Sequence, residues 1–397
     1  MVEWKEMWQV TTWDKKFQGV DKSMQPQVMS YKYLLAKDLF ALAKPFGDVK
    51  LLSTGTQEGW TTEELAGSFL SEGEVVTIPW GKSPGAQNPV KYYKGKFVTG
   101  DNRIATSTDT EILNNKFLFY WMYANSDTIE TFYRGAGIQH PSMFKVLTMP
   151  IPIPSLSEQQ RIVGILDTFT SSIENLKEQI AQRRKQYEYY RDQLLDLEGK
   201  EGVEMKRIGE LFSFKNGLNK EKKFFGQGNP IVNYTDVYHN NRITKDILKG
   251  RVELSDSEID RFRVCKGDVF FTRTSETKDE IGYASVMLED VPNCTFSGFL
   301  LRARPTTLLL LPEYCAYCFI SYKVRQEIIK SSTLTTRALT NGGLLSKISI
   351  PVPSLSEQQR IVSILDTFEA SIQNLEQQLA QREKQYEYYR NKLLTFE

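Results

Sequence analysis

Four cysteines offer the first candidate chemistry of this 397-residue chain, because Cys315 and Cys318 have the C-x-x-C spacing of redox centres and zinc sites. A zinc ion would need two further ligands, and Cys265, Cys294 and His239 do not stand at a supporting spacing. The surrounding segment, EYCAYCFISYKV, is typical of an apolar helix face, where small buried cysteines are common. We therefore expect this pair in a helix core and no metal site on the chain.

Catalytic motifs are not evident elsewhere, and we expect no catalytic residue. The sequence contains no Gly-x-x-x-x-Gly-Lys-Ser/Thr phosphate loop. The segments nearest to an adenine-methyltransferase motif, residues 228–231 and 233–236, lack the proline pair and aromatic residue that present an amide to a flipped base. The two histidines, His140 and His239, belong to no recognisable catalytic triad.

A long internal repeat organises the chain. The letters PSLSEQQRIV occur at residues 154–163 and again at 353–362, which is 199 positions later. The match extends without a gap over 48 positions, of which 35 are identical. The chain is therefore expected to contain two variable domains, each followed by one copy of the repeat. The predicted segments are a first variable domain at 1–150, a first repeat at 151–198, a second variable domain at 199–349 and a second repeat at 350–397.

Each repeat is expected to form one long helix. Its proline-containing start is extended, and the following Ser-x-x-Glu is a capping box that begins helices. Apolar residues then recur at alternating steps of four and three, the period of a coiled-coil seam. A lone helix would leave this seam in water, so the two helices are expected to pair antiparallel. The predicted seam residues are Leu166, Phe169, Ile173, Leu176 and Arg183 in the first repeat, and Leu365, Phe368, Ile372, Leu375 and Arg382 in the second.

Two features of the repeats each have two explanations. The basic seam residues Arg183 and Arg382 either fix the register of the helices or extend their charges to solvent at a wide crossing. A set of off-seam apolar residues either packs on the adjoining variable domain or forms two equivalent docking surfaces for partner proteins. These off-seam residues are Val163, Ile165 and Tyr189 in the first repeat, and Val362, Ile364 and Tyr388 in the second.

Composition and charge limit the class of protein. With 40% hydrophobic and 25% charged residues, the chain has a soluble, globular composition. No apolar run reaches 18 residues and the first residues lack a signal-peptide pattern, so we expect a cytoplasmic protein without membrane contact. The net charge is +1, but residues 199–349 carry a net +5, residues 1–150 are neutral and each repeat is −2. Any positive surface is therefore expected on the variable domains.

The junctions IPIPSLSEQQRIVGILD (151–167) and IPVPSLSEQQRIVSILD (350–366), each between a variable domain and a long helix, resemble those of the specificity subunits of Type I restriction–modification systems. The resemblance covers the whole chain. It implies an α+β fold in which two mixed α/β target-recognition domains are separated by a pair of long antiparallel coiled-coil helices with an internal pseudo-two-fold repeat. Each domain would read one half of an asymmetric, bipartite site in double-stranded DNA, and the helices would set the spacing.

The resemblance also implies partners. Two modification subunits, which are methyltransferases, would dock on the helices, and restriction subunits, which are ATP-dependent translocases and nucleases, would join them. S-adenosylmethionine, ATP and magnesium would be held by these partners, and the specificity subunit itself would carry no cofactor and no catalytic activity. Two competing hypotheses remain: a coiled-coil tethering protein whose variable domains bind other proteins, and a free-standing enzyme, which the missing motifs disfavour.

The variable domains end on a similar plan, although their sequences differ. In each, a helix is followed by a polar loop and then by a strand that leads into the repeat. The predicted segments are a helix at 113–124, a loop at 133–141 and a strand at 142–152 in the first domain, and a helix at 311–324, a loop at 332–343 and a strand at 344–353 in the second.

Loop side chains that suit base reading are the candidate DNA-binding residues. Arg favours guanine, Asn and Gln favour adenine, and Lys and hydroxyl groups favour phosphates. Each residue taken alone is also explained as an ordinary surface or turn residue. Two domains on a rigid rod would read half-sites about 10 base pairs apart. The candidates are Arg103, Arg134, Gln139 and His140 in the first domain, and Arg273, Thr274, Lys278, Arg337 and Asn341 in the second.

Overall fold

The computed structural model describes residues 2–83 and 90–396, which form two compact units. The first unit contains the chain up to Leu176 together with the segment from Gln378 onward, and the second runs from Lys177 to Gln377. Two long helices, α7 (Leu156–Leu195) and α14 (Leu355–Leu393), each contribute one half to each unit. Every unit is therefore one variable domain plus halves of both repeats.

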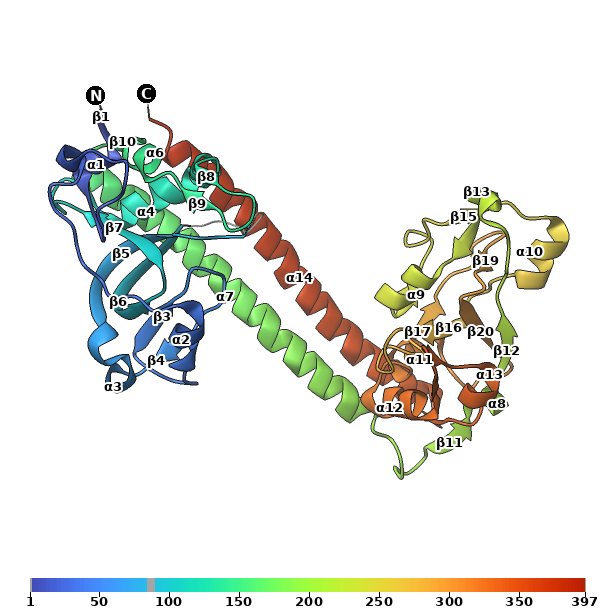
Figure 1. Ribbon diagram of the computed structural model, residues 1–397. Helices are drawn as coiled ribbons and strands as arrows, with labels where there is room; N and C mark the ends of the chain where they lie inside the picture. Colours follow the sequence, from blue (N-terminus) through green and yellow to red (C-terminus); the bar gives the residue numbers. More distant parts are fainter. Residues whose placement is uncertain (1, 84–89, 397) are drawn as a thin grey trace. The chain divides into compact units, whose positions relative to one another are not determined.

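Each unit is built on a mixed sheet, and the two sheets share one strand order. Figure 1 labels strands of both sheets, among them β5, β6 and β7 in the first unit and β12, β16 and β20 in the second. The order is β2-β7-β5-β6-β3 in the first unit, where β4 extends the edge, and β12-β20-β16-β18-β14 in the second. Within these five strands all neighbours are antiparallel except β3–β6 and β14–β18, which are parallel. The two variable domains therefore have the same sheet topology despite their dissimilar sequences. The strands are β2 (Thr11–Trp13), β3 (Val49–Leu52), β4 (Trp60–Thr61), β5 (Ser71–Pro79), β6 (Lys91–Thr99), β7 (Asn102–Ser107), β12 (Phe212–Asn216), β14 (Arg242–Ile243), β16 (Val269–Thr272), β18 (Ala284–Met287) and β20 (Leu300–Pro305).

The ends of the two variable domains also follow one plan. Each domain opens with a strand, a one-turn helix and a strand, and its first strand pairs antiparallel with the strand before the long helix. Each closes with two helices, a short hairpin, a one-turn helix and that last strand. These elements are β1 (Glu3–Glu6), α1 (Met7–Val10), α4 (Asn115–Ala124), α5 (Ser126–Glu130), β8 (Tyr133–Arg134), β9 (His140–Pro141), α6 (Met143–Leu147) and β10 (Pro150–Ile153) in the first unit, and β11 (Glu204–Arg207), α8 (Ile208–Leu211), α11 (Pro312–Cys318), α12 (Tyr322–Ser331), β21 (Thr333–Leu334), β22 (Ala338–Leu339), α13 (Gly342–Leu345) and β23 (Ser349–Val352) in the second.

The remaining elements lie in the insertions between sheet strands. In the second unit they include a three-stranded sheet, β15-β13-β19, and a short strand, β17, that pairs with β22. In the first unit the described insertions hold short helices and the edge strand β4. These elements are η1 (Lys22–Met24), α2 (Ala36–Ala41), α3 (Glu63–Ala66) and η2 (Gly67–Phe69) in the first unit, and η3 (Lys222–Phe224), β13 (Phe225–Val232), α9 (Tyr234–His239), β15 (Arg251–Val252), α10 (Asp256–Phe262), β17 (Thr274–Ser275) and β19 (Thr295–Phe296) in the second.

The long helices begin at the predicted caps and pack antiparallel within each unit. The backbone N–H of Glu158 donates to Ser155 Oγ at 3.3 Å, and Glu357 donates to Ser354 in the same way at 3.3 Å. In the first unit the Phe169 ring stacks on Tyr389 with ring centroids 5.4 Å apart. In the second unit Tyr190 stacks on Phe368 at 5.5 Å and Arg184 forms an ion pair with Glu376. The predicted α+β fold with a paired-helix element is confirmed.

Two predictions for the domain ends are wrong in detail. The segment expected to be a continuous strand at 142–152 holds the helix α6 before β10, and the segment at 344–353 begins with the end of α13 before β23. The segment expected to be one helix at 311–324 is two helices, α11 and α12. The buried Ser321 hydroxyl donates to the Cys318 carbonyl at 2.8 Å, and such local bonds compete with helix continuation.

Candidate nucleic-acid interface

A buried glutamine in each repeat fastens the variable domain to its long helix. The amide of Gln159, which is 0% exposed, donates to the carbonyls of Ile112 and Pro154 at 2.8 and 2.9 Å and accepts from the Asn114 N–H at 2.8 Å. Gln358 repeats this arrangement in the second unit with three equivalent bonds of 2.7 to 2.9 Å. The segment before α4 or α11 is thereby fixed at the beginning of a long helix.

Three chain segments meet at one end of each sheet. They are the exit of the central strand, the turn that precedes the next strand in the sheet, and the hairpin near the end of the domain. In the first unit the Trp80 N–H donates to the Asp101 carbonyl at 3.0 Å, and in the second the Arg273 N–H donates to the Phe299 carbonyl at 3.2 Å. Trp80 and Arg273 directly follow β5 and β16, so the two sites are structurally equivalent.

The first unit brings together Arg134, Gln139 and His140 on the β8–β9 hairpin. Arg134 pairs with His140 in the strand register, and His140 Nδ1 lies 2.8 Å from the Trp80 carbonyl oxygen. The Gln139 and Lys82 backbones exchange two hydrogen bonds of 2.9 and 3.1 Å, which join the hairpin to the strand exit. The side chains of Arg134 and His140 are exposed and that of Gln139 is half-buried, so this edge presents hydrogen-bonding groups to solvent.

Arg103 lies behind this edge. It is only 6% exposed, its Nη1 is 2.9 Å from Asp101 Oδ1, and its guanidinium carbon lies 4.1 Å from the centroid of the Trp80 ring. In this arrangement Arg103 supports Trp80 from inside the domain. Its contact with a base stays a prediction, because the side chain would have to leave Asp101 to make it.

The second unit brings Arg273, Thr274 and Arg337 to the equivalent edge. The ladder between β17 and β22 pairs Thr274 with Leu339, and the Arg337 guanidinium lies 2.8 Å from Glu276 on the surface. Arg273 Nη1 donates to the Gly298 carbonyl at 3.0 Å, whereas its buried Nε has no hydrogen-bond partner within the described residues.

The other two candidates of the second unit lie at the margins of this edge. Lys278 is exposed in the loop that follows β17. Asn341 accepts the Leu344 N–H at 3.0 Å through Oδ1 and therefore caps α13, which gives its side chain a structural role. Contact between these nine candidates and DNA bases stays a prediction.

Sequence reasoning missed the apolar part of both edges. Ile138 in the first unit and Phe299 in the second are 67% and 68% exposed beside the polar candidates. The signal in the sequence was a glycine next to an aromatic residue, at Gly81 after Trp80 and at Gly298 before Phe299, because such glycines allow close approach of a neighbouring chain.

The cysteine pair belongs to the core, as predicted. Cys315 and Cys318 are buried on α11 among apolar side chains of the second unit. Burial raises the pKa of Cys318 to about 12 and holds that of Cys315 well above its usual value, so both are thiols at neutral pH. Among the residues that the structure describes, no three His, Cys, Asp or Glu side chains converge as metal ligands.

The off-seam residues divide into two groups. Val163 packs against the core of the first unit and Val362, 3% exposed, belongs to the core of the second. Tyr189 and Tyr388 are 62% and 59% exposed. Ile165 and Ile364 are half-buried.

The basic seam residues have equivalent surroundings. Arg183 lies over the Phe368 ring, 6.0 Å from its centroid, in the second unit, and Arg382 lies 5.6 Å from the Phe169 ring in the first. Both therefore contact the opposite helix. The other predicted seam residues are buried or half-buried on the same helices. They are Leu166, Ile173, Leu176, Leu365, Ile372 and Leu375.

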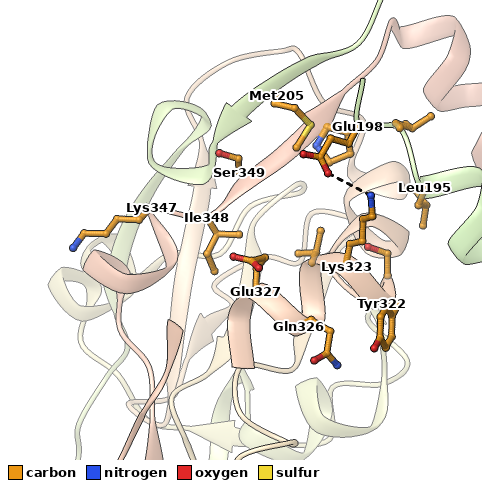
Figure 2. A pocket seen from close by; sticks show the side chains of 14 residues that line it. Leu195, Glu198, Met205, Tyr322, Lys323, Gln326, Glu327, Lys347, Ile348 and Ser349 are labelled. Carbon is orange, nitrogen blue, oxygen red and sulfur yellow. Dashed lines mark hydrogen bonds and ion pairs between the residues drawn. The ribbon is translucent and has the colours of Figure 1, made fainter. Parts of the chain in front are cut away.

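A cavity of the second unit lies away from these candidates. Figure 2 shows its lining, with Met205, Tyr322 and Ile348 around the space and Lys323 bonded to Glu198 at 3.3 Å. The position equivalent to Met205 in the first unit is Trp4, whose ring packs edge-on against Trp121 with centroids 5.7 Å apart. The cavity is therefore lined by a methionine at the position where the first unit has a packed tryptophan ring.

Comparisons with known proteins agree with this architecture. A family model described as the Type I restriction modification DNA specificity domain matches residues 36–183 and 200–384. The chain is 29% identical over 330 residues to the Type I restriction enzyme EcoR124I/EcoR124II specificity subunit of Escherichia coli, covering 74% of each chain. It is 28% identical over 355 residues to a putative type I restriction enzyme specificity subunit of Haemophilus influenzae, covering 84% of this chain and 86% of that one.

Solved structures share the fold. A Type I restriction–modification S subunit from M. genitalium superposes with a TM-score of 0.60 at 17% identity, over 100% of this chain and 97% of that one. A chain from a study of complex assembly and conformational transition of the type I R-M system gives a TM-score of 0.57 at 15% identity, over 99% and 97%. No helix within residues 2–83 and 90–396 combines the length and apolarity needed to cross a bilayer. Because the family model matches most of the sequence, in one segment for each half, the chain belongs to the Type I restriction–modification DNA specificity family.

Proposed function

We propose that this chain is the DNA-recognition subunit of a Type I restriction–modification complex, in which each variable domain reads one half of an asymmetric, bipartite site. The observation that carries the proposal is the equivalence of the two edges. The same sheet topology presents Trp80 and Asp101 in one domain and Arg273 and Phe299 at the same places in the other. One scaffold with different exposed chemistry suits the reading of two different half-sites. A tethering protein has no need of this equivalence, and family membership disfavours it.

The helices serve as spacer and dock in this proposal. Two modification subunits would bind one repeat each, and the exposed tyrosines Tyr189 and Tyr388 are the best candidates for their contact because they are identical in both repeats. Aromatic side chains of this kind are enriched at the centres of protein interfaces. The buried Val163 and Val362 would act indirectly, by holding the variable domains.

Catalysis would reside on the partners. The modification subunits would methylate adenine with S-adenosylmethionine, and restriction subunits would supply ATP-driven translocation and cleavage with magnesium. This chain would determine which DNA sequence is bound, through side chains that contact the DNA and take no part in the reaction.

Methylation mapping at single-base resolution tests the proposal. Genomic DNA would be compared from cells that express the methyltransferase with this chain and cells that express the methyltransferase alone. We expect a split, asymmetric adenine-methylated motif that requires this chain. An identical methylation pattern in both cell lines, with the complex shown to be expressed, would refute the proposal and favour the tethering hypothesis.

A further inference from the structure

A large apolar side chain projects into solvent at each candidate DNA-reading edge. Ile138 is 67% exposed between Arg134 and His140, and Phe299 is 68% exposed beside Arg273. Isolated exposed apolar residues are common on proteins and need no explanation by themselves. These two differ because they occupy structurally equivalent edges and because their backbones are fixed.

The Ile138 backbone is held close to the strand exit. The neighbouring Gln139 exchanges its two backbone hydrogen bonds with Lys82. A Cβ atom at Gly81 would lie 2.8 Å from Ile138 Cγ2, so the missing side chain at position 81 leaves room for Ile138 beside the strand exit. Ile138 and His140 line one cleft together with Trp80, which places the apolar and polar groups on one surface.

The Phe299 turn is fixed even more completely. The Gly298 N–H donates to the Leu218 carbonyl at 2.7 Å. Arg273 donates twice to the same turn, from Nη1 to the Gly298 carbonyl at 3.0 Å and from its backbone N–H to the Phe299 carbonyl at 3.2 Å. A Cβ at Gly298 would lie 1.9 Å from Asn219 Oδ1 and 2.9 Å from the Leu218 carbonyl oxygen, which is backbone, so the turn requires glycine. Arg273 is therefore both a candidate base reader and the support of the aromatic side chain beside it.

The groups on the DNA bases indicate what such side chains would contact. In the major groove the base edges present hydrogen-bond donors and acceptors and one apolar group, the C5-methyl of thymine. An apolar side chain on a hydrogen-bonded backbone segment, close to arginine, glutamine, histidine and threonine residues, matches that pattern. We propose that Ile138 and Phe299 each contact the methyl group of a thymine in the half-site that their own domain reads. This inference rests on the proposed function.

The test is methylation mapping of the intact complex with the variants Ile138→Ala and Phe299→Ala. Each variant should relax the methylated motif at one T·A position, in opposite halves, while the other half stays unchanged. Leu308→Ala, which removes a 93% exposed side chain from the loop after β20, is the matched control and should leave the motif intact. A uniform fall in methylation without a change at one position would overturn the proposal and indicate a protein contact, and an unchanged motif would overturn it as well.

A binding measurement on the complex gives an independent outcome. Replacing the relevant thymine by uracil removes only the methyl group and should weaken binding by the wild-type complex about fourfold, the value of one buried methyl. Binding by the corresponding alanine variant should not respond to this replacement. Equal responses of wild-type and variant complexes would refute the methyl contact. Failure of the proposed function gives a different result, because no methylated motif would then depend on this chain.

Discussion

The buried amide of Gln159 offers a direct test of how the repeat holds a recognition domain. Gln159→Met keeps the length of the side chain and removes all three hydrogen bonds to Ile112, Asn114 and Pro154. Each group left without a partner costs about 1–3 kcal/mol when buried. Two of the three lie at partly buried positions where water relieves the loss, so we expect a decrease of about 3 kcal/mol in the free energy of unfolding of the first unit.

The sequence provides a unit-specific probe for this experiment. All six tryptophans of the chain lie between Trp4 and Trp121, in the first unit, so their fluorescence reports the unfolding of that unit. Urea denaturation followed by tryptophan fluorescence should show a lower midpoint for Gln159→Met. The exposed neighbour Gln160 supplies the control, and Gln160→Met should leave the free energy of unfolding within about 0.5 kcal/mol of the wild-type value.

The reasoning is refuted if the two methionine variants unfold at the same urea concentration. The equivalent change in the second unit, Gln358→Met, should lower the stability seen by far-ultraviolet circular dichroism. If the two units unfold independently, it should leave the tryptophan transition in place.

Three further outcomes are expected. The hydrogen bond from Lys220 lowers the pKa of Glu258 to about 2. The ionised Glu258 carboxylate therefore stabilises the folded state above pH ~4.5, and this stabilisation is lost as the pH falls towards 2. Glu258→Gln should flatten an acid-unfolding profile over that range. Iodoacetamide at pH 8 should label the half-buried Cys265 well before the buried Cys318 in native protein, and equal labelling rates by mass spectrometry would contradict the burial of α11. Phe368→Ala removes a ring that is stacked between the helices in the second unit and should cost about 2 kcal/mol in urea denaturation followed by circular dichroism, whereas a loss below ~0.5 kcal/mol would argue against a packed seam.

The shared sheet topology of the two variable domains escapes sequence analysis because strand order is not a local property. β5 and β16 occupy the same central place although their sequences differ, since a central strand needs only apolar residues buried on both faces. Many sequences meet that requirement. The equivalence appears only when the neighbours of each strand are known.

Local periodicity determined the helical part of this protein. The heptad pattern and the serine caps fixed the start, length and pairing of α7 and α14, because spacing along a helix determines which residues share a face. The same reasoning placed Cys315 and Cys318 in a helix core. These conclusions needed no information about distant parts of the chain.

Tertiary structure alone decided which loop side chains reach solvent. Arg103 and Arg134 look alike in the sequence, yet one is held inside by Asp101 and Trp80 and the other is exposed on a hairpin. Phe299 was not singled out in the sequence, and it is 68% exposed in the turn that follows Gly298. The direction of a loop side chain depends on hydrogen bonds with segments far away in sequence. Residue type and spacing within the loop do not determine those bonds.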